Sequence, residues 1–369
     1  MNNTKSNPVR ICFVAPKAYG LFDPQIQTGF GGAEVDLYLL AAELAKDSDF
    51  DVSFITADYG QIDGQTIENV RVLKSLDWKQ NSLVGAMKIR RALKQARADM
   101  YMIKTASPGV PLVWAFCKTH RKKFLYRTAH SSECDGTYIK KHPLLGRLFA
   151  FCLRGADVVF TQNQSDSEQL RRTMRVESLV IPNGHRKTTA AACRRDHVLW
   201  VGRSVGFKQP QRYLELARQF PHVPFIMICR QAAGDMDYPS LQKQAGQISN
   251  LKFVQNADFH DIDKYFARAM VFVNTSDAEG FANTFIQAAK NGTAILSYAV
   301  NPDDFLTRFA CGLCCGGNFT MMVRGLDSLL QGAKYLQAGE NAKKYFGQRH
   351  DIEKIARKYK AVLFGLVGR

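Results

Sequence analysis

The stretch AMVFVNTSDAEGFANTFIQAAKNG, residues 269–292, joins a strand, a loop and a helix, and this passage decides the fold class. Its apolar start is typical of a buried strand. The loop carries Glu279 directly before a glycine, and helical spacing resumes near Asn283. Asn283 or Thr284 can cap the helix, whose exposed N–H groups attract an anion. The stretch therefore predicts either an anion or sugar site or an ordinary capped helix.

The same alternation of strand and helix runs along the whole chain. Helical stretches such as 33–47, with apolar residues near one face, separate the strands. Alternation of this kind predicts parallel sheets that are covered on both faces. The other strand-like runs are 10–16, 51–56, 100–104, 123–129, 156–162 and 178–182, then 197–202, 224–229, 251–255 and 293–298.

The chain of 369 residues is too long for one core, which indicates two α/β domains. The strand pattern restarts after a polar, basic segment at 185–196, which indicates a linker. We expect tandem doubly wound domains at 1–188 and 189–349. The helical segment 350–369 can dock on either domain, with the N-terminal one favoured. Ligands of such sheets lie at the carboxyl ends of the strands, and with two domains we expect a deep cleft between them.

Composition narrows the class of protein. Hydrophobic residues make up 46% and charged residues 22%, as in a soluble globular protein. The first ten residues lack the apolar core of a signal peptide, and no apolar run is long enough to span a bilayer. The nine cysteines show no repeating spacing, which indicates reduced thiols in a cytosolic protein. CGLCC (311–315) has no matching Cys or His pair, so we expect no metal site.

The positive charge is concentrated in the first half of the chain. The net charge is +17, and from Lys79 to Arg154 there are 16 basic residues against three acidic ones. Such a surface favours an anionic membrane, an acidic glycan or nucleic acid, although a merely solvated surface is a fair competitor. The sequence shows no recognition helix, aromatic RNA-binding motif or zinc-finger spacing, so nucleic acid is not expected.

Two cations follow a strand end in VGRSVGFKQP, residues 201–210. Arg203 and Lys208 are five positions apart, and two glycines give the turn its freedom. Arginine binds phosphate as a planar fork and lysine as a point charge, so the pair is well suited to a diphosphate. The alternative is two solvated surface cations.

Two further motifs lie in the first half. In GFGGAE (29–34) the glycines allow close approach of a ligand to a helix start, which suits an anion, whereas the spacing supports a dinucleotide site poorly. His130 follows a strand end and can position a sugar or acceptor hydroxyl, although a lone histidine is often structural. Glu133 and Asp135 are secondary candidates for acceptor contacts.

The motifs occur together and in order, and as a set the chain resembles the retaining glycosyltransferases of family 4, which have the GT-B fold. The resemblance covers nearly the whole chain. It depends on GGAE (31–34), VIPNG (180–184), the cation motif at 201–210 and SDAEGFANTFIQA (276–288). The last two motifs are the more specific.

The resemblance implies roles for individual residues. Gly31 and Gly32 resemble the loop that packs against the donor phosphates. Arg203 and Lys208 resemble the cation pair that neutralises the diphosphate, and His130 resembles the histidine near the transferred sugar. The opening stretch resembles the E-x7-E motif: Glu279 contacts sugar hydroxyls, the backbone of Gly280, Phe281, Ala282 and Asn283 faces the diphosphate, and Gln287 stands where the second acid normally binds ribose.

The function that the resemblance implies is a metal-independent glycosyltransferase without a cofactor. It moves a sugar from a UDP- or GDP-linked donor to a glycan or lipid-linked acceptor, with retention, in synthesis of cell-surface polysaccharide or lipopolysaccharide. We expect a cytoplasmic protein, peripheral at the inner face of the membrane where the basic surface docks. The alternatives are a nucleotide-sugar epimerase of the same fold and a non-catalytic subunit that binds nucleotide sugars.

Overall fold

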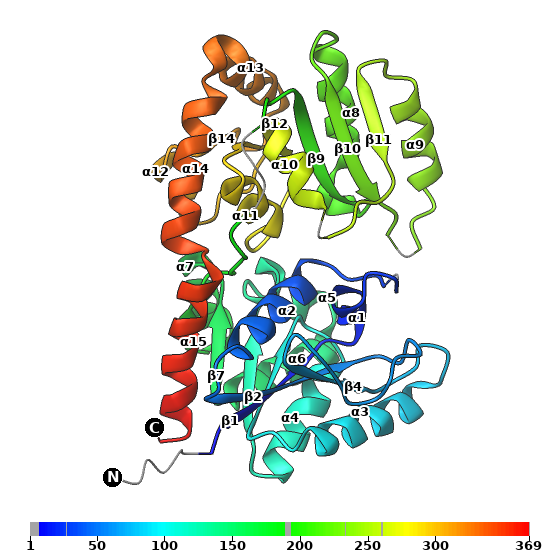
Figure 1. Ribbon diagram of the computed structural model, residues 1–369, viewed down its shortest axis with the longest axis vertical. Helices are drawn as coiled ribbons and strands as arrows, with labels where there is room; N and C mark the ends of the chain where they lie inside the picture. Colours follow the sequence, from blue (N-terminus) through cyan, green and yellow to red (C-terminus); the bar gives the residue numbers. More distant parts are fainter. Residues whose placement is uncertain (1–6, 27, 189–192, 233, 260, 369) are drawn as a thin grey trace. The chain divides into compact units, whose positions relative to one another are not determined.

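A computed structural model describes residues 7–26, 28–188, 193–232, 234–259 and 261–368 (Figure 1). The chain divides into two compact units. The first consists of Met1–Arg186 together with Ile352–Arg369, and the second of Lys187–Asp351. Part of the expected linker, residues 189–192, lies outside the described residues.

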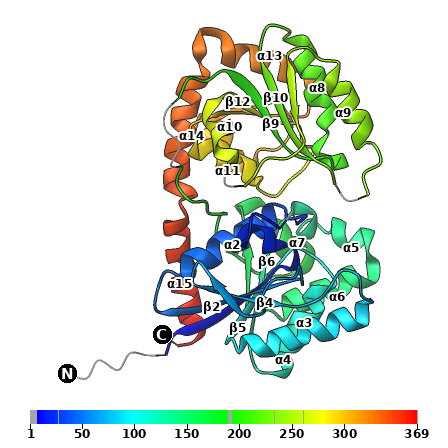
Figure 2. The same ribbon diagram turned by 45° about the vertical axis from the view of Figure 1, so that its right-hand side comes forward.

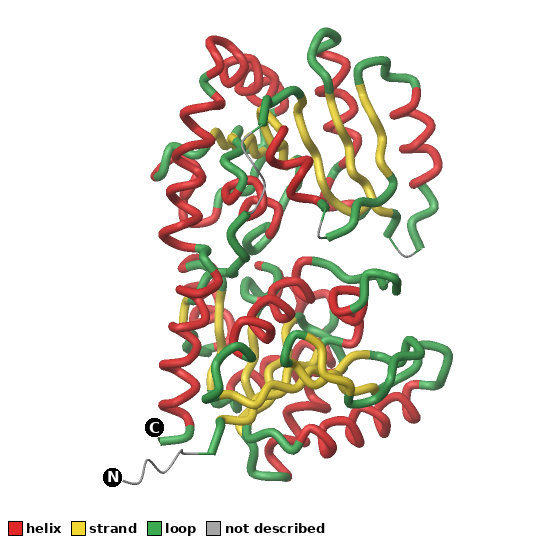
Figure 3. The backbone as a smooth tube through the Cα atoms, in the orientation of Figure 1, coloured by secondary structure: helices red, strands yellow, loops and turns green. Residues whose placement is uncertain are grey.

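The first unit is built on an eight-stranded sheet, in which β3 is antiparallel to β4 and the other described pairings are parallel. Parallel neighbours require crossover connections, and Figure 3 shows helices packed around the strands. The order across the sheet is β3 (Gln65–Ile67), β4 (Val70–Lys74), β2 (Phe50–Thr56), β1 (Val9–Val14), β5 (Met100–Lys104), β6 (Lys123–Arg127), β7 (Val158–Thr161) and β8 (Leu179–Val180).

Helices cover both faces of this sheet. One core joins alternate strand residues to α3 (Ser82–Ala96), α4 (Gly109–Thr119), α6 (Pro143–Arg154) and α7 (Gln164–Met174). The other strand residues face α2 (Gly32–Leu44) and α15 (Ile352–Leu366), which pack together; the ring of Phe160, for example, lies 4.8 Å from that of Tyr359. The short helices are η1 (Pro16–Ala18), α1 (Tyr19–Phe22), η2 (Ser131–Glu133) and α5 (Thr137–Lys141).

The second unit has a six-stranded sheet whose described pairings are all parallel. Its order is β11 (Leu251–Val254), β10 (Phe225–Arg230), β9 (His197–Arg203), β12 (Ala269–Asn274), β13 (Ala294–Ser297) and β14 (Gly312–Cys314). Separate cores on its two faces show that it is also doubly wound (Figure 2). One core includes α8 (Pro210–Gln219), α9 (Tyr238–Gly246) and α13 (Phe319–Leu330), and the other α10 (Ile262–Arg268), α11 (Asn283–Lys290), α12 (Phe305–Arg308) and α14 (Tyr335–Arg349). The short helices are η3 (Gly206–Lys208), η4 (Pro302–Asp304) and η5 (Gln331–Ala333).

The predicted fold class, two Rossmann-like doubly wound sheets in tandem, is confirmed. The short strands β3, β4 and β14 were not predicted from the sequence. Strand β14 lies inside CGLCC and has only three residues, which are too few to show a strand pattern. Gly312 starts this strand at φ +157°, and a Cβ there would lie 1.7 Å from the Ile295 carbonyl oxygen. The glycine is therefore required for β14 to pair with β13.

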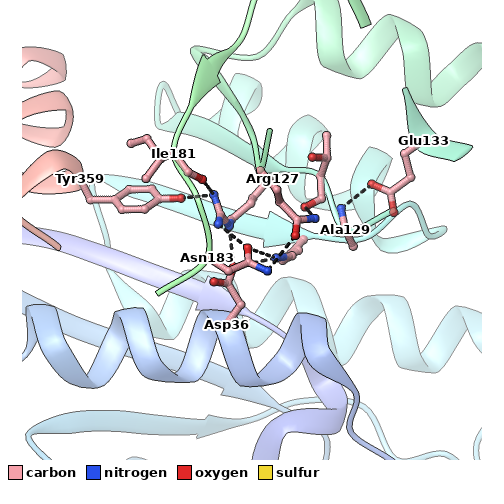
Figure 4. Close-up of polar contacts among 10 residues, drawn as sticks. Asp36, Arg127, Ala129, Glu133, Ile181, Asn183 and Tyr359 are labelled. Atoms are coloured by element: carbon pink, nitrogen blue, oxygen red, sulfur yellow. Dashed lines mark hydrogen bonds and ion pairs between the residues drawn. The ribbon is translucent and has the colours of Figure 1, made fainter. Parts of the chain in front are cut away.

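A buried polar network links the elements of the first unit (Figure 4). Asp36 on α2 accepts hydrogen bonds from Lys104 Nζ on β5 at 2.7 Å and from Arg127 Nε on β6 at 2.5 Å. All three side chains are at most 3% exposed. Arg127 also donates to Asn183 Oδ1 at 2.6 Å, the Ile181 carbonyl at 3.0 Å and the Tyr359 hydroxyl at 2.5 Å. The network thus ties α2, two strands, the segment after β8 and α15 together.

One carboxylate in this network faces two cations. Burial alone would raise the pKa of Asp36, but Arg127 and Lys104 outweigh burial and lower it. Burial lowers the pKa of Lys104 to about 8, with Asp36 opposing the change and Arg127 adding to it. Asp36 is therefore ionised at neutral pH, and Lys104 is the member of the network that loses its charge first as the pH rises.

We expect stability to depend on pH through Lys104. Below pH 8 the lysine is charged in both the folded and the unfolded chain, and the penalty of its burial is fully present. Between pH 8 and its ordinary pKa of 10.5, only the unfolded chain retains the proton. The unfolding free energy should therefore rise with pH in this window for wild type relative to Lys104→Met. Urea unfolding at each pH tests this.

The matched control is Lys46→Met, which removes an exposed lysine that is paired with Glu43. Its difference from wild type should stay flat across the same window. A constant difference between wild type and Lys104→Met would contradict the prediction.

Candidate functional site

The carboxyl edge of the second sheet gathers the polar residues of the candidate site. Arg203 ends β9, Arg230 ends β10 and Asn274 ends β12, and Lys208 lies in the turn after β9. Parallel strands place their carboxyl ends at one edge, where loops run into helix starts. This is the edge at which the sequence predicts a ligand.

A single ion pair forms the centre of the site. Lys208 Nζ donates to Glu279 Oε1 at 2.7 Å, with side chains 16% and 11% exposed. The same oxygen accepts from Ser276 Oγ at 2.7 Å and Asn274 Nδ2 at 2.9 Å. Burial alone would raise the pKa of Glu279, but Lys208 and then these neutral donors lower it below its ordinary value. Glu279 is therefore a fixed anion at neutral pH.

The two loops that carry this pair are bonded to each other. Trp200, which is buried in β9, donates to Thr275 Oγ1 at 2.8 Å, and Thr275 donates to the Lys208 carbonyl at 2.6 Å. The Asp277 N–H donates to the Phe207 carbonyl at 2.9 Å. These bonds hold the turn that carries Lys208 against the loop that carries Glu279. The position of the ion pair therefore does not depend on flexible side chains alone.

Two arginines lie side by side at the same edge. Strand pairing places Arg203 opposite Arg230. Within the part of the chain that the structure describes, the Arg203 side chain has no hydrogen-bond or ion-pair partner. Arg230 donates to Asn256 Oδ1 at 2.8 and 3.1 Å, and burial and then Arg203 lower its pKa. A bound anion would relieve this repulsion.

Helix α11 starts at the same edge. Its N-cap residue is Ala282, and no side chain caps it, so the expectation that Asn283 or Thr284 would act as the cap is wrong. The helix begins at Asn283, so both residues already lie inside it. The Thr284 hydroxyl is buried without a hydrogen-bond partner among the described residues. A buried unpaired hydroxyl is costly unless a ligand or water binds it, and a helix start favours an anion.

The other residues of the predicted motif contribute differently. The Phe281 ring packs against Phe305 at 5.1 Å and His350 at 4.8 Å, so its side chain belongs to the core. At position 281, therefore, only the backbone can face a ligand. Gln287 lies on α11, eight residues after Glu279, and is 8% exposed.

His130 lies at the carboxyl edge of the first sheet, after β6. Its Nδ1 accepts a hydrogen bond from the Ser132 N–H at 3.1 Å. An accepting Nδ1 carries no proton, so the neutral ring carries its proton on Nε2. The backbone thus selects the tautomer in which the outer nitrogen is the donor.

Glu133 supports this loop from inside. It is 4% exposed, and its carboxylate accepts from Tyr126 OH at 2.7 Å, Ala129 N at 3.0 Å and Ala106 N at 3.3 Å. Burial raises the pKa of Glu133, and these bonds oppose the change only in part. The expectation that Glu133 contacts an acceptor is wrong, because the carboxylate is engaged with the loops after β5 and β6. Asp135 is exposed and accepts from the Thr137 N–H at 2.8 Å.

The glycine loop carries its own anion. The Gly31 N–H donates to Glu34 Oε2 at 2.8 Å, and α2 begins at Gly32, which is exposed. The carboxylate of Glu34 therefore already occupies one donor at this helix start, and a phosphate here would compete with it.

Several residues at the carboxyl edge of the second sheet were not predicted from the sequence. Asn274, Ser276 and Thr284 lie within or next to the quoted motif, but their spacing alone does not show that two of them contact Glu279. Arg230 ends a strand that the sequence predicts, and comparison of strand ends would have placed it beside Arg203. Among the described residues no group of three or more His, Cys, Asp or Glu side chains is placed to hold a metal ion. No described helix is both long and apolar enough to cross a membrane.

Comparison with known families covers both units. The family model described as glycosyltransferase family 4 matches residues 30–186, and that described as glycosyl transferases group 1 matches residues 185–345. An uncharacterized glycosyltransferase of Haemophilus influenzae is 23% identical over 363 residues, which are 94% of this chain and 100% of that protein.

Solved structures share the fold at low sequence identity. The sucrose-phosphate synthase of Thermosynechococcus elongatus has a TM-score of 0.78 and 17% identity, over 97% of this chain and 99% of that one. The E. coli trehalose-6-phosphate protein bound with UDP-2-fluoro glucose has a TM-score of 0.70 and 11% identity, over 96% and 98%. WaaG, a glycosyltransferase involved in lipopolysaccharide biosynthesis, has a TM-score of 0.69 and 14% identity, over 96% and 100%.

The structural matches establish the GT-B fold, and the two family matches run without a gap from residue 30 to residue 345. The chain belongs to glycosyltransferase family 4, the retaining glycosyltransferases that use nucleotide-sugar donors.

Proposed function

We propose that this protein transfers a sugar, with retention, from a UDP- or GDP-linked donor to a glycan or lipid-linked acceptor in cell-surface polysaccharide synthesis of the lipopolysaccharide type. The observation that carries the proposal is the Lys208–Glu279 pair, which lies at the same carboxyl edge of the second sheet as the exposed Arg203. Fixed charges of both signs at one edge suit a ligand with a diphosphate end and a hydroxyl-rich end.

The donor lies on the second unit in this proposal. Arg203 and Lys208 bind the diphosphate, and the start of α11 receives a phosphate oxygen. Glu279 accepts from hydroxyls of the transferred sugar. Gln287 hydrogen-bonds ribose through its amide, which is a weaker bond than the charge-assisted one of a glutamate. The backbone N–H groups of Gly280, Phe281, Ala282 and Asn283 complete the diphosphate contacts.

The reaction breaks the bond between the anomeric carbon and the diphosphate oxygen. Negative charge grows on the leaving phosphate, and Lys208 can donate one N–H to it while another N–H of the ammonium group stays hydrogen-bonded to Glu279. Preorganised donors of this kind stabilise charge that develops in the transition state. The acceptor oxygen then bonds to the anomeric carbon on the same face, and its proton passes to the leaving phosphate. Since these groups supply the positive charge, we propose that no metal ion is required.

The first unit binds the acceptor in this proposal. In this proposal His130, which carries its proton on Nε2, donates to a sugar hydroxyl, and a phosphate at Gly31 and Gly32 would have to displace the Glu34 carboxylate from the Gly31 N–H. The E. coli neighbour bound with a UDP-sugar supports a uridine donor, and the neighbour from lipopolysaccharide biosynthesis supports the pathway. The basic first unit suits an acidic glycan or an anionic membrane, with the protein peripheral at the cytoplasmic face.

A panel of UDP-, GDP- and ADP-sugars identifies the donor by thermal shift. We expect one nucleotide sugar to stabilise wild type, and Arg203→Ala to weaken its binding by about tenfold to a hundredfold, since a charged hydrogen bond contributes about 1.5–3 kcal/mol. The control is Arg218→Ala, which removes an exposed arginine of α8 in the same unit and should bind as wild type does. Flat responses to every nucleotide sugar would overturn the proposal.

Glu279 and Gln287 should separate into a catalytic and an affinity role. We expect Glu279→Gln to lower kcat by about 10²–10³-fold, as the loss of a preorganised charge contact does, with a smaller change in donor KM. Gln287→Ala should raise donor KM several-fold and leave kcat near that of wild type, whereas Gln287→Glu should lower KM. The opposite division, with Gln287→Ala inactive and Glu279→Gln active, would show that the two roles are reversed.

A further inference from the structure

Helix α6 in the first unit carries apolar side chains on both of its faces. Phe149, Ala150 and Leu153 are buried in the core of the unit. On the outer face Leu144 is 85% exposed and Leu148 44%, and Phe151, at 53%, follows three positions later. Residues at i, i+4 and i+7 lie on one stripe of a helix. A surface helix normally presents polar residues on its outer face. An apolar stripe in that position indicates a contact with an apolar partner.

The helices around the stripe are basic. Helices α3, α4, α5 and α6 contain nine Lys and Arg residues and no Asp or Glu. Arg147 and Arg154 lie on α6 itself, both exposed, and the exposed Lys140 and Lys141 end α5, which packs against α6. An apolar row flanked by cations on the surface of a helix is the composition of an interfacial membrane helix.

The neighbouring helix α3 repeats this composition. Leu83 is 73% exposed and Met87 57%, one turn apart, and Lys88, Arg90, Arg91 and Lys94 follow them on the same helix. Helix α3 packs against α4, and α4 packs against α6, so the three helices form one layer on one side of the first sheet (Figure 2). The layer therefore presents exposed apolar side chains at two places among lysines and arginines.

We propose that this surface, the outer face of α6 with the adjoining basic residues of α5 and α3, docks the protein on an anionic lipid bilayer. Leu144, Leu148 and Phe151 enter the headgroup region, and the cations contact lipid phosphates. The inference rests on the proposed function, in that it commits the basic first unit to a membrane rather than to a free acidic glycan. A glycan would contact the cations but would leave the apolar stripe in water.

The positive charge of this surface also argues against a second copy of the chain as its binding partner. In a twofold dimer the same surface faces itself, so the nine cations would meet nine like charges with no carboxylate on these helices to compensate. A bilayer that contains anionic lipid supplies both the negative charge and the apolar interior.

Flotation of the full chain with vesicles of phosphatidylcholine, with and without phosphatidylglycerol, tests the proposal. Wild type should bind only the anionic vesicles, and less tightly at high salt. The double variant Leu144→Ser/Leu148→Ser should bind at least about tenfold more weakly, since each leucine loses an apolar contact. Arg147→Gln/Arg154→Gln should weaken binding and reduce its salt dependence.

The matched control removes exposed apolar side chains from the second unit. Met236 is 87% and Leu336 51% exposed, and Met236→Ser/Leu336→Ser should bind vesicles as wild type does. Thermal shift with the stabilising nucleotide sugar should be unchanged in the α6 variants, which shows that they are folded. Donor binding without vesicle binding would overturn the docking surface alone, whereas vesicle binding without any donor would overturn the proposed function alone.

Two further outcomes would also overturn the proposal. Wild-type binding to neutral vesicles as strong as to anionic ones would remove the role of the cations. Self-association of wild type that the α6 variants abolish, without vesicle binding, would make this face an interface between copies of the chain.

Discussion

The ion pair between Lys208 and Glu279 is the constraint on which the second unit's site depends. It joins the turn after β9 to the loop after β12, and Thr275, Asn274 and Ser276 hold both ends in place. A buried charge pair of this kind is weak evidence for stability, because the cost of desolvation offsets its attraction. Its arrangement is explained better by function, since it places a fixed anion and a fixed cation at a sheet edge where a nucleotide sugar presents hydroxyls and phosphates.

The first unit also contains a buried network of charged side chains, but this network lies in its core. Asp36 accepts hydrogen bonds from Lys104 and Arg127 in the core. Arg127 also donates to Asn183 and to Tyr359 of the last helix. The final helix is thereby bonded to the same unit as the first strand. Glu133 accepts hydrogen bonds from the loops after β5 and β6, and the loop after β6 carries His130. Rigid support of this kind suits a histidine that must present one particular nitrogen.

The fold was predictable from sequence because apolar runs alternate with helical periods, and parallel sheets follow from that alternation. Strand β14 was not, because it has three residues, and its glycine is required by a contact with Ile295 that spacing does not show. In the candidate site the motif predicted the positions of Glu279, Lys208 and Arg203. It did not predict that Phe281 packs in the core, that Glu133 is buried, or that Arg230 lies opposite Arg203, because these depend on packing between segments distant in sequence.

In the proposed function the charged edge of the second sheet binds the diphosphate of a nucleotide sugar. Isothermal titration of wild type with UDP, UMP and uridine, and with the guanosine series, tests it most directly. Affinity should rise steeply from nucleoside to diphosphate, by about tenfold or more for each phosphate, since charged hydrogen bonds contribute about 1.5–3 kcal/mol each. Equal affinity for nucleoside and diphosphate in both series, or no binding of either, would contradict it.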